Sequence, residues 1–531
     1  MSGNFTFSQV PMADIPRSVF NRTHGHKTTF DAGLLIPFFV DEALPGDTFN
    51  VHASIFARLA TPIVPLMDNL HMDVFWFAVP NRLVWENWQK FCGEQENPGD
   101  TTDFSIPQVT AGGSGFGTGS IFDYFGLPVS VGSLQVNALF ARAYNIIYNE
   151  WFRDENLCAR VPQHKGDGPD AAADYAVRKR GKRHDYFTSC LPWPQKGPAT
   201  EVPLGASAPV IASAVNAGPQ FSFAGAGSGA AMGINSGTAG DPNPPIYLSG
   251  DLPATGTPGK DLMWWNSGLI ADLSSATSVT INALRQAFQI QRLLERDARG
   301  GTRYIELIKS HFGVTSPDAR LQRPEFLGGG SIAVHINPVS QTSPATGTTG
   351  YQATPQGNLA GFGTAGGSQG FTKSFVEHCV ILGLVCVRAD LSYQQGLNRM
   401  FSRKTRYDFY WPAFAHLGEQ AVLSKEIYCD GTADDETVFG YQERWAEYRY
   451  KPSQITGKFR STDAQSLDIW HLAQHYVNRP LLVQTWIEEN PPVDRVIAVP
   501  SEPQFLFDSH ITMKCTRPMP TYSVPGLIDH F

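Results

Sequence analysis

The segment 47–60, DTFNVHASIFARLA, decides the fold class because its apolar side chains alternate with polar ones. Phe49, Val51 and Ile55 fall on one parity, while Asn50 and His52 fall on the other. Successive side chains of a β-strand point to opposite faces of its sheet, so this pattern predicts a half-buried strand. The segment 504–518, QFLFDSHITMKCTRP, alternates in the same way and predicts a second strand near the other end of the chain.

Further β candidates lie between these two segments. They are residues 70–79, 332–337, 374–388, 424–429 and 494–499. Because these segments are far apart in the sequence, their strands must pair across long insertions. The pattern predicts a mainly β protein, a sandwich or barrel with elaborate loops.

Two segments have the three- and four-residue spacing of apolar positions that is typical of amphipathic helices. The first is 134–152, with a stripe formed by Val136, Phe140, Ala143, Ile147 and Trp151. The second is 281–299, with a mixed stripe formed by Leu284, Phe288, Gln291 and Leu294 or Glu295. We expect the second helix to end at Gly300–Gly301, since glycine favours the C-terminal turn of a helix.

Two stretches are dominated by small and polar residues. Residues 199–263 are rich in Ala, Gly, Ser and Pro, and residues 340–372 are rich in Gly, Thr, Ser and Gln. Few large apolar side chains are present to anchor them. We therefore predict two irregular, loop-rich insertions.

Composition narrows the class of protein. Charged residues make up 17% of the 531 residues, below the roughly 25% of soluble domains. The net charge of −8 argues against a surface that binds nucleic acid everywhere, so any phosphate contact must be local. Seven cysteines without paired spacings fit reduced thiols better than a disulfide framework. The first residues lack the pattern of a signal peptide. The longest apolar run, Cys379–Val387, is too short to span a bilayer. We therefore expect a soluble, unsecreted chain.

Motifs for catalysis, cofactors or metals are weak. Gly361–Gly366 matches a dinucleotide fingerprint, but we expect a loop there, without the preceding strand and following helix that the fingerprint needs. His471 and His475 have metal-ligand spacing, yet no general-base Glu and no obvious third ligand accompany them. No catalytic residue, metal ligand or cofactor is predicted. A carbohydrate-binding or hydrolytic β-sandwich, with sugars stacked on Trp264, Trp265 or Trp411, stays an alternative, as does a non-specific single-strand-binding module.

Two groups of cations are candidate DNA contacts. Arg178, Lys179, Arg180, Lys182 and Arg183 place five cations within six positions of an acidic chain. The adjacent Tyr186 and Phe187 could stack on bases, which would suit a single strand. The alternative is a solvated turn or salt bridges to a neighbouring subunit. A second group, Arg17, Arg22 and Lys27, lies in a basic N-terminal arm that also contains His24 and His26.

Seven blocks of sequence resemble a known family. They are residues 30–49, 70–88, 144–157, 187–197, 294–314, 323–330 and 439–461, for example LHMDVFWFAVPNRLVWENW at 70–88 and FGYQERWAEYRYKPSQITGKFRS at 439–461. They resemble, in order, the major capsid protein of the Microviridae, in the gokushovirus branch. The resemblance extends from about residue 15 to the C-terminus and leaves out chiefly 199–263 and 340–372.

The resemblance implies one viral jelly-roll domain over residues 1–531, an eight-stranded β-barrel with long loop and helical insertions, preceded by an extended arm at 1–30. Sixty copies would form a T=1 icosahedral shell around a circular single-stranded DNA genome. Insertion 199–263 would form a threefold protrusion, so Glu201 to Lys260 are candidates for host attachment. The implied partners are other copies of the chain, the packaged DNA, small internal DNA-binding and scaffolding phage proteins, and a bacterial surface receptor. The virion would be assembled in the host cytoplasm.

The aromatic stretch 71–93, HMDVFWFAVPNRLVWENWQKFCG, could line a ligand pocket or join parts of the core. Before Pro80, both parities are apolar, which predicts a strand covered on both faces. After it, Asn81 is placed to cap a helix with Val84, Trp88 and Phe91 on one stripe. We predict that these aromatic residues join the barrel to a helical insertion.

Overall fold

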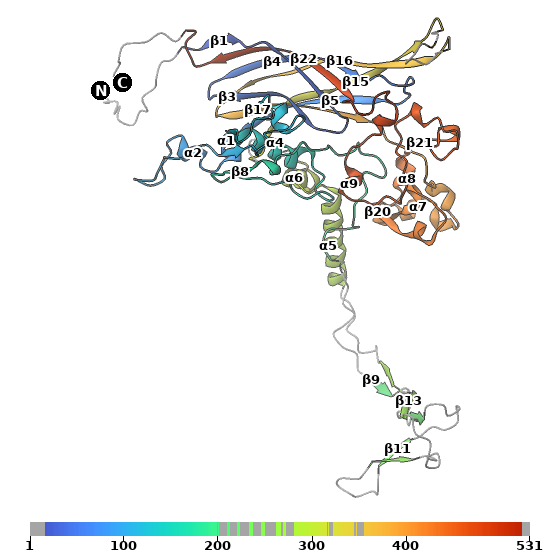
Figure 1. Ribbon diagram of the computed structural model, residues 1–531. Helices are drawn as coiled ribbons and strands as arrows, with labels where there is room; N and C mark the ends of the chain where they lie inside the picture. The colour runs from blue at the N-terminus through green and yellow to red at the C-terminus, as the bar shows by residue number, and fades with distance from the viewer. Residues whose placement is uncertain are drawn as a thin grey trace. The chain divides into compact units, whose positions relative to one another are not determined.

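The computed structural model describes residues 16–198, 200, 281–315, 317, 322–344, 347 and 355–522, and the backbone of short strands between 210 and 271 (Figure 1). The chain forms two compact units. One consists of Met1–Lys196 with Glu295–Phe531, and the other of Gly197–Leu294. Among the described residues, no helix has both the length and the apolar character that crossing a membrane requires.

Eight strands of the first unit form two layers of four. The first layer has the order β2 (His24–Phe30), β22 (Phe505–Arg517), β4 (Thr48–Leu59) and β16 (Leu359–Ser374). The second has the order β15 (Glu325–Ser340), β5 (Leu70–Pro80), β17 (Cys379–Ala389) and β3 (Ile36–Ala43). Neighbouring strands are antiparallel throughout. Numbered along the chain, the layers read 1-8-3-6 and 5-4-7-2, which is the strand order of a jelly roll.

The two layers are joined through β15. Residues 335–340 of this strand pair with β16, and residues 325–334 pair with β5. A single sheet therefore curls back on itself, and the predicted viral jelly-roll fold is confirmed. The short strand β1 (Ser18–Asn21) adds to β22 beside β2.

The barrel core lies between the layers. Trp76 on β5 is fully buried, with its ring 5.1 Å from Phe38 and 5.4 Å from Phe371 on the opposite layer. Phe38 also meets Phe507 on β22 at 5.6 Å. The inward positions of β4 and β22 are buried at every second residue, as their alternation predicted.

The outer face of β5 is covered by a helical layer. Phe75 and Phe77 pack against Phe152, with ring distances of 5.1 and 5.8 Å, just after helix α4 (Leu139–Ile147). Trp85 is also fully buried in this second core. The aromatic stretch therefore joins barrel and insertion, as predicted. Its helix differs, because two single turns, α1 (Asn81–Val84) and α2 (Trp88–Phe91), replace one helix, and Asn81 makes no side-chain cap.

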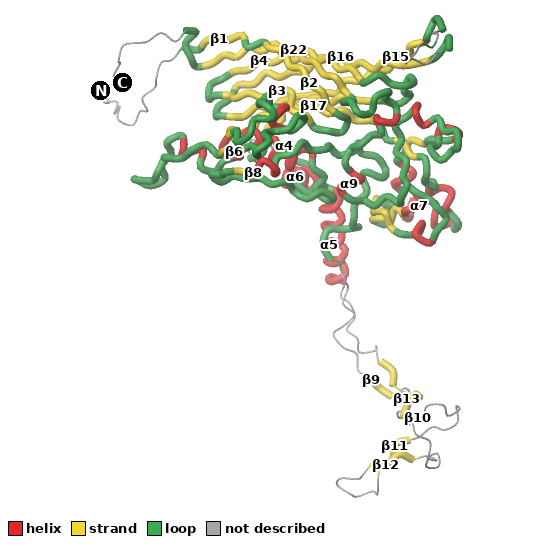
Figure 2. The backbone as a smooth tube through the Cα atoms, viewed as in Figure 1, coloured by secondary structure: helices red, strands yellow, loops and turns green. Residues whose placement is uncertain are grey.

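Two long insertions hold most of the remaining chain, and loops dominate their described parts (Figure 2). Residues 81–324, between β5 and β15, contain α1, α2, β6 (Gln108–Thr110), α3 (Ile121–Tyr124), β7 (Gln135–Asn137), α4, a π-helical turn (Tyr148–Phe152), β8 (Asp170–Ala171), β9 (Val210–Ala212), β10 (Gln220–Phe223), β11 (Gly233–Ser236), β12 (Ile246–Ser249), β13 (Leu262–Asn266), β14 (Leu269–Ala271), α5 (Ile281–Arg299) and α6 (Tyr304–Phe312). Residues 390–504, between β17 and β22, contain β18 (Ser392–Tyr393), β19 (Glu419–Leu423), α7 (Ser424–Ile427), β20 (Val438–Glu443), α8 (Ala446–Arg449), β21 (Ser453–Gln454) and α9 (Gln484–Ile487). Helix α5 has the predicted bounds.

The prediction of a loop-rich insertion over 340–372 is wrong for its second half. Residues 359–374 form β16, a central strand whose residues 363–374 pair with the whole of β4. Glycine is required here because the layers approach closely. A Cβ at Gly367 would lie 2.7 Å from Cδ1 of Ile332 on the facing layer. Low apolar content in this segment therefore reflects tight packing rather than a loop.

Three smaller predictions need correction. Residues 424–427 form helix α7 rather than a strand, since Glu426 accepts a hydrogen bond from the backbone N–H of Leu423 and closes the turn. Residues 493–495 form a 3₁₀ turn; of 494–499, Val496 and Ile497 fill the core, and the segment forms an isolated bridge from Ile497 to Pro62 instead of a strand. From residue 18, the predicted N-terminal arm is extended but belongs to the sheet as β1 and β2. Residues 1–15 lie outside the described part.

Candidate functional surfaces

The basic segment 178–183 is held on both sides by backbone hydrogen bonds. The N–H of Leu35 donates to the carbonyl of Arg178, and the N–H of Arg180 donates to Gly33. On the other side, the N–H of Lys182 donates to Ile487. The segment thus connects the edge of β3 to the second insertion.

Two of its arginines are neutralised within the chain. Arg180 donates to Oδ2 of Asp73 at 2.5 Å, and Arg388 on β17 donates to the same oxygen at 2.8 Å. Burial works to raise the pKa of Asp73, but the guanidinium of Arg180, together with Ser331 and Arg388, holds that pKa below its ordinary value. Arg183 pairs with Asp390 at 2.8 Å.

Lys182 is buried rather than available to a ligand. Its side chain is 5% exposed, donates to Gln474 at 2.9 Å and lies 4.3 Å from the ring centre of Trp486. Burial lowers the pKa of Lys182 to about 8, against the opposing effect of Glu489. Glu489 is also buried, which raises its pKa to about 7 although Lys182 and Arg388 favour its ionised form. Lys179 is half-buried and donates to Asn490 at 2.7 Å.

The suggestion that Tyr186 and Phe187 stack on bases is wrong. Both rings are almost fully buried in a third core cluster. The hydroxyl of Tyr186 donates to Glu426 at 2.9 Å, and Phe187 packs 4.7 Å from Tyr393. Neither aromatic face is open to a ligand.

The three N-terminal cations have separate surroundings. Arg17 donates to the carbonyl of Gly46 at 2.6 Å. Arg22 pairs with Asp41 at 2.7 Å. Lys27 pairs with Asp508 at 2.9 Å, but its side chain stays 77% exposed. Such an exposed pair leaves the ammonium accessible to other anions.

A surface of which only Trp411 was singled out from the sequence lies in the second insertion, and we call it the aromatic surface. Its exposed rings are Phe401, Tyr407, Phe409, Tyr410, Trp411, Tyr448 and Tyr450. Arg403 lies over two of them, 4.3 Å from the ring of Tyr448 and 5.3 Å from that of Phe409. A cavity of about 330 Å³ lined by Arg399, Arg403 and Tyr448 adjoins it. The signal was present in RMFSRKTRYDFYW (399–411), where aromatic and basic residues interleave.

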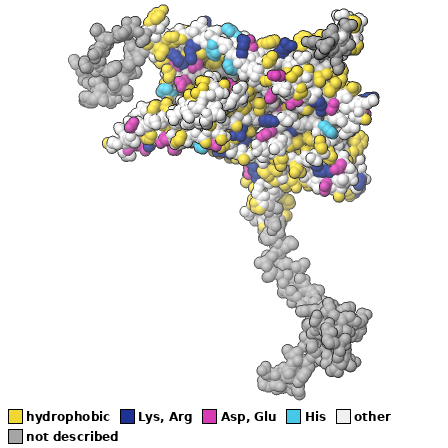
Figure 3. All heavy atoms as spheres, in the orientation of Figure 1, with side chains coloured by type: hydrophobic (Ala, Val, Ile, Leu, Met, Phe, Trp, Pro, Cys, Tyr) yellow, Lys and Arg dark blue, Asp and Glu magenta, His cyan; other side chains and the backbone are white. Residues whose placement is uncertain are grey.

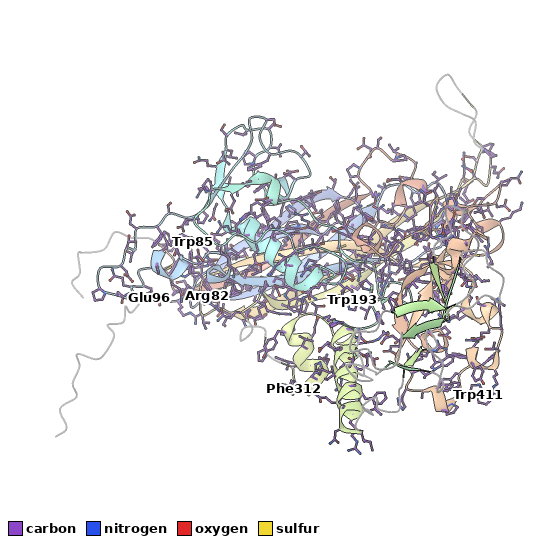
Figure 4. All side chains as sticks on the ribbon, turned by 90° about the horizontal axis from the view of Figure 1, so that it is seen from below. Arg82, Trp85, Glu96, Trp193, Phe312 and Trp411 are labelled. Carbon is purple, nitrogen blue, oxygen red and sulfur yellow. The ribbon has the colours of Figure 1, made fainter. Side chains whose placement is uncertain are left out.

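Trp411 marks this surface in Figure 4, at the opposite end of the first unit from Glu96. The side chain of Trp411 is 52% exposed, and its Nε1 donates to the carbonyl of Arg406. The other two candidates for sugar stacking, Trp264 and Trp265, have side chains outside the described part.

Helix α5 has exposed apolar residues at helical spacing. Ile281, Leu284 and Phe288 are spaced by three and four residues, and all three are exposed. The predicted stripe is therefore present, but nothing in the described chain covers these three side chains. Nearly all of Glu201 to Lys260, the host-attachment candidates, lies outside the described residues; only the backbone of β9 to β12 is described there.

The metal and cofactor motifs do not form sites in the described residues. His471 is buried outside any helix, with Nε2 2.7 Å from the carbonyl of Phe459. No group of three or more His, Cys, Asp or Glu among the described residues is placed to hold a metal ion. Gly361–Gly366 lies inside strand β16, so it lacks the strand-to-helix turn of a dinucleotide site, although the loop expected there was wrong.

Comparisons with known proteins give matches over almost the whole chain. Residues 8–527 match the model of a family described as capsid protein (F protein). The chain is 50% identical over 541 residues to capsid protein VP1 of Bdellovibrio phage phiMH2K, covering 99% of this chain and 98% of the relative. It is 42% identical over 584 residues to capsid protein VP1 of Chlamydia phage 1, covering 98% and 97%. Capsid protein VP1 of Spiroplasma virus 4 is 37% identical over 545 residues, again covering 98% and 97%.

Proposed function

Because the chain belongs to the phage capsid protein (F protein) family, as a major capsid protein of the gokushovirus branch of the Microviridae, we propose that sixty copies close a T=1 shell around a circular single-stranded DNA genome. The chain is a structural protein of the virion and not an enzyme. The observation that carries the proposal is the family match across residues 8–527 of a chain with jelly-roll strand order.

The aromatic surface supports self-assembly. Tyr, Trp and Arg are enriched at the energetically important centres of protein interfaces. Here they are gathered on one surface of the isolated subunit, beside the cavity lined by Arg399 and Arg403. A subunit of a closed shell must keep such surfaces exposed until it binds its neighbours. Under closed symmetry, the same contact repeated between successive subunits then forms a ring of subunits.

The apolar stripe of α5 supports association around a threefold axis. Copies of an amphipathic helix bury their apolar positions against one another when they pack side by side. Phe288→Glu would place a charge in this stripe, whereas Gln289→Glu would add the same charge to a neighbouring exposed position. We expect Phe288→Glu to lower the yield of intact particles well below that of Gln289→Glu. Equal yields would remove α5 from the proposed contact.

Host attachment is proposed for the insertion from Glu201 to Lys260, with a bacterial surface receptor as partner. Its support is the separate compact unit Gly197–Leu294 and the Gly-rich sequence, because loops of this kind carry function without building the core. Replacing about residues 205–258 with a short linker should leave shells intact and abolish adsorption to the host. Unchanged infectivity would refute the attachment role.

We also propose that assembly takes place in the host cytoplasm together with small internal DNA-binding and scaffolding phage proteins. The DNA-contact candidates now separate into two sets. Arg22, Arg180, Lys182 and Arg183 are neutralised or buried within the chain, which favours a structural role for them. Arg17, Lys27 and Lys179 stay candidates for DNA contact. Arg178, whose Nε is buried without a hydrogen-bond partner, is a weaker one.

The direct test is the mass of particles purified from cells that express the phage genes. The proposal predicts a protein mass of sixty chains of 58.2 kDa each, plus encapsidated single-stranded DNA that nuclease cannot reach. Small irregular oligomers, even beside the other phage proteins, would refute it.

A further inference from the structure

The described insertion residues of the first unit leave the outer face of the β2–β22–β4–β16 layer uncovered, and we call it the open sheet face. The helices α1, α3 and α4 contact β5, β3 and β17, which all belong to the other layer. Figure 1 shows the same arrangement, with β22, β4 and β16 on the side of the first unit away from α1 and α4. Every second residue of β4 and most of those of β22 are therefore exposed.

The charge of the open sheet face is opposite to that of the whole chain. Arg58 on β4, Lys514 on β22 and Lys27 on β2 are exposed on this face. The carboxylate of Asp508 lies on the same face and pairs with Lys27. Arg58 and Lys514 have no carboxylate within ion-pair distance among the described residues. The chain as a whole has a net charge of −8. Lys, Arg and His side chains are visible along this side of the molecule in Figure 3.

Two aromatic rings on the open sheet face are open to stacking. Phe56 is 53% exposed in the middle of β4, and Phe362 on β16 is also exposed. The residue opposite Phe56 on β16 is Gly366, whose Cβ position has nothing within 4 Å. The glycine leaves one side of the Phe56 ring clear. Aromatic rings on a flat sheet stack on the bases of a single strand without regard to sequence.

Two further apolar side chains of the open sheet face, Leu506 on β22 and Val19 on β1, are 51% and 63% exposed. Most of its other side chains are polar: His52, Ser54, Asn50, His510, Thr512, Ser368 and Thr372. Hydroxyl, amide and imidazole groups are donors for phosphate and sugar oxygens. A stable protein–protein interface would instead have an apolar centre that is depleted of charge. The composition of this face therefore fits a hydrated polyanion better than another subunit.

We propose that the open sheet face binds the packaged single-stranded DNA through Arg58, Lys514 and Phe56. This inference rests on the proposed function, because it requires the face to point into a DNA-filled shell. Few cations spread over a wide polar face give a contact that is weak, independent of sequence and sensitive to salt. A genome that must be packed and later released needs contacts of this kind.

The test measures binding of a fluorescent thirty-nucleotide oligothymidine to purified, unassembled full-length subunits. Arg58→Gln with Lys514→Gln removes two exposed cations, and Lys165→Gln with Lys458→Gln makes the same charge change at exposed positions outside the open sheet face and the aromatic surface. Each phosphate contact contributes about 0.7 to the slope of log affinity against log salt, so the face variant should lower the slope by about 1.4 and the affinity about tenfold at 0.15 M salt. Phe56→Ser should weaken binding without changing the slope.

Particles made from the same variants give the second readout. The face variant should form shells in normal number with a smaller fraction filled by DNA, while the Lys165 and Lys458 variant should fill normally. Unchanged oligonucleotide binding by the face variant would overturn the inference. So would a loss of shells from folded subunits, which would make the face a protein contact. If the unsubstituted chain forms no shells, the proposed function fails instead, and oligonucleotide binding still decides the inference.

Discussion

Asp73→Asn tests whether the basic segment 178–183 is a structural connection or a DNA contact. Asp73 lies on β5 and accepts hydrogen bonds from Arg180 and Arg388, which are 18% and 13% exposed. Asparagine keeps the shape of the side chain but removes the carboxylate that forms ion pairs with two nearly buried guanidinium groups. Removing one partner of a buried ion pair costs about 3–5 kcal/mol, and the residual exposure of the arginines favours the lower end, about 3 kcal/mol.

The assay is urea unfolding of the unassembled subunit at pH 7. Asp508→Asn is the matched control, because Asp508 pairs with Lys27 on the open sheet face, where both side chains are largely exposed. An exposed pair contributes about 0–1 kcal/mol, so the control should change the free energy of unfolding little. The folded-state pKa of Asp73 lies below its ordinary value of 3.8, so its stabilising effect is complete above that pH and is lost as the pH falls through the folded-state pKa. The difference between the unsubstituted chain and Asp73→Asn should shrink accordingly in acid.

The reasoning would be refuted if Asp73→Asn unfolded at the same urea concentration as the unsubstituted chain. If that variant also packaged less DNA, the cations of 178–183 would be DNA contacts that Asp73 merely positions.

Two further predictions concern packing and buried charge. Gly367→Val should lower the free energy of unfolding by about 1–3 kcal/mol, because the new side chain would overlap Ile332. Gly366→Val is the control, since its side chain would point into open space and should change the free energy of unfolding little. Equal urea midpoints for the two variants would contradict the close approach of the layers. Burial raises the pKa of Glu489 to about 7, so ionising this carboxyl as the pH rises from 5 to 8 destabilises the unsubstituted chain, even beside Lys182. Glu489→Gln cannot ionise and should therefore gain stability relative to the unsubstituted chain over this pH range. A difference that does not vary with pH would exclude that burial penalty.

Strands with one buried face were predictable from the sequence. Segments 47–60 and 504–518 alternate because one side of β4 and β22 fills the core and the other meets solvent. Helix α5 was predicted to the residue, since its stripe ends at Gly300. Both patterns are local consequences of the period of the backbone.

Strand β16 could not be predicted in this way. Its glycines lower the apolar content to that of a loop, and only the facing Ile332 explains why they are there. The strand predicted at 494–499 was wrong for the opposite reason, because apolar side chains in an irregular turn have the sequence pattern of a strand. Local propensity does not report such tertiary constraints.

The DNA-contact residues show the same limit. A run of cations from Arg178 to Arg183 gives no indication that Asp73 and Asp390, more than a hundred positions away, neutralise part of it. Part of the open sheet face could be recognised from the sequence, as the alternating polar residues of segments 47–60 and 504–518. It was missed because polar residues on a half-buried strand were assigned to solvent rather than to a ligand.

A cryo-electron microscopy reconstruction of particles purified from cells that express the phage genes tests the central claim most directly. Our account predicts sixty copies on a T=1 lattice, with the open sheet face lining the interior and DNA density beside Arg58, Lys514 and Phe56. A shell with another number of copies, or one in which the open sheet face points outward or is buried between subunits, would contradict it.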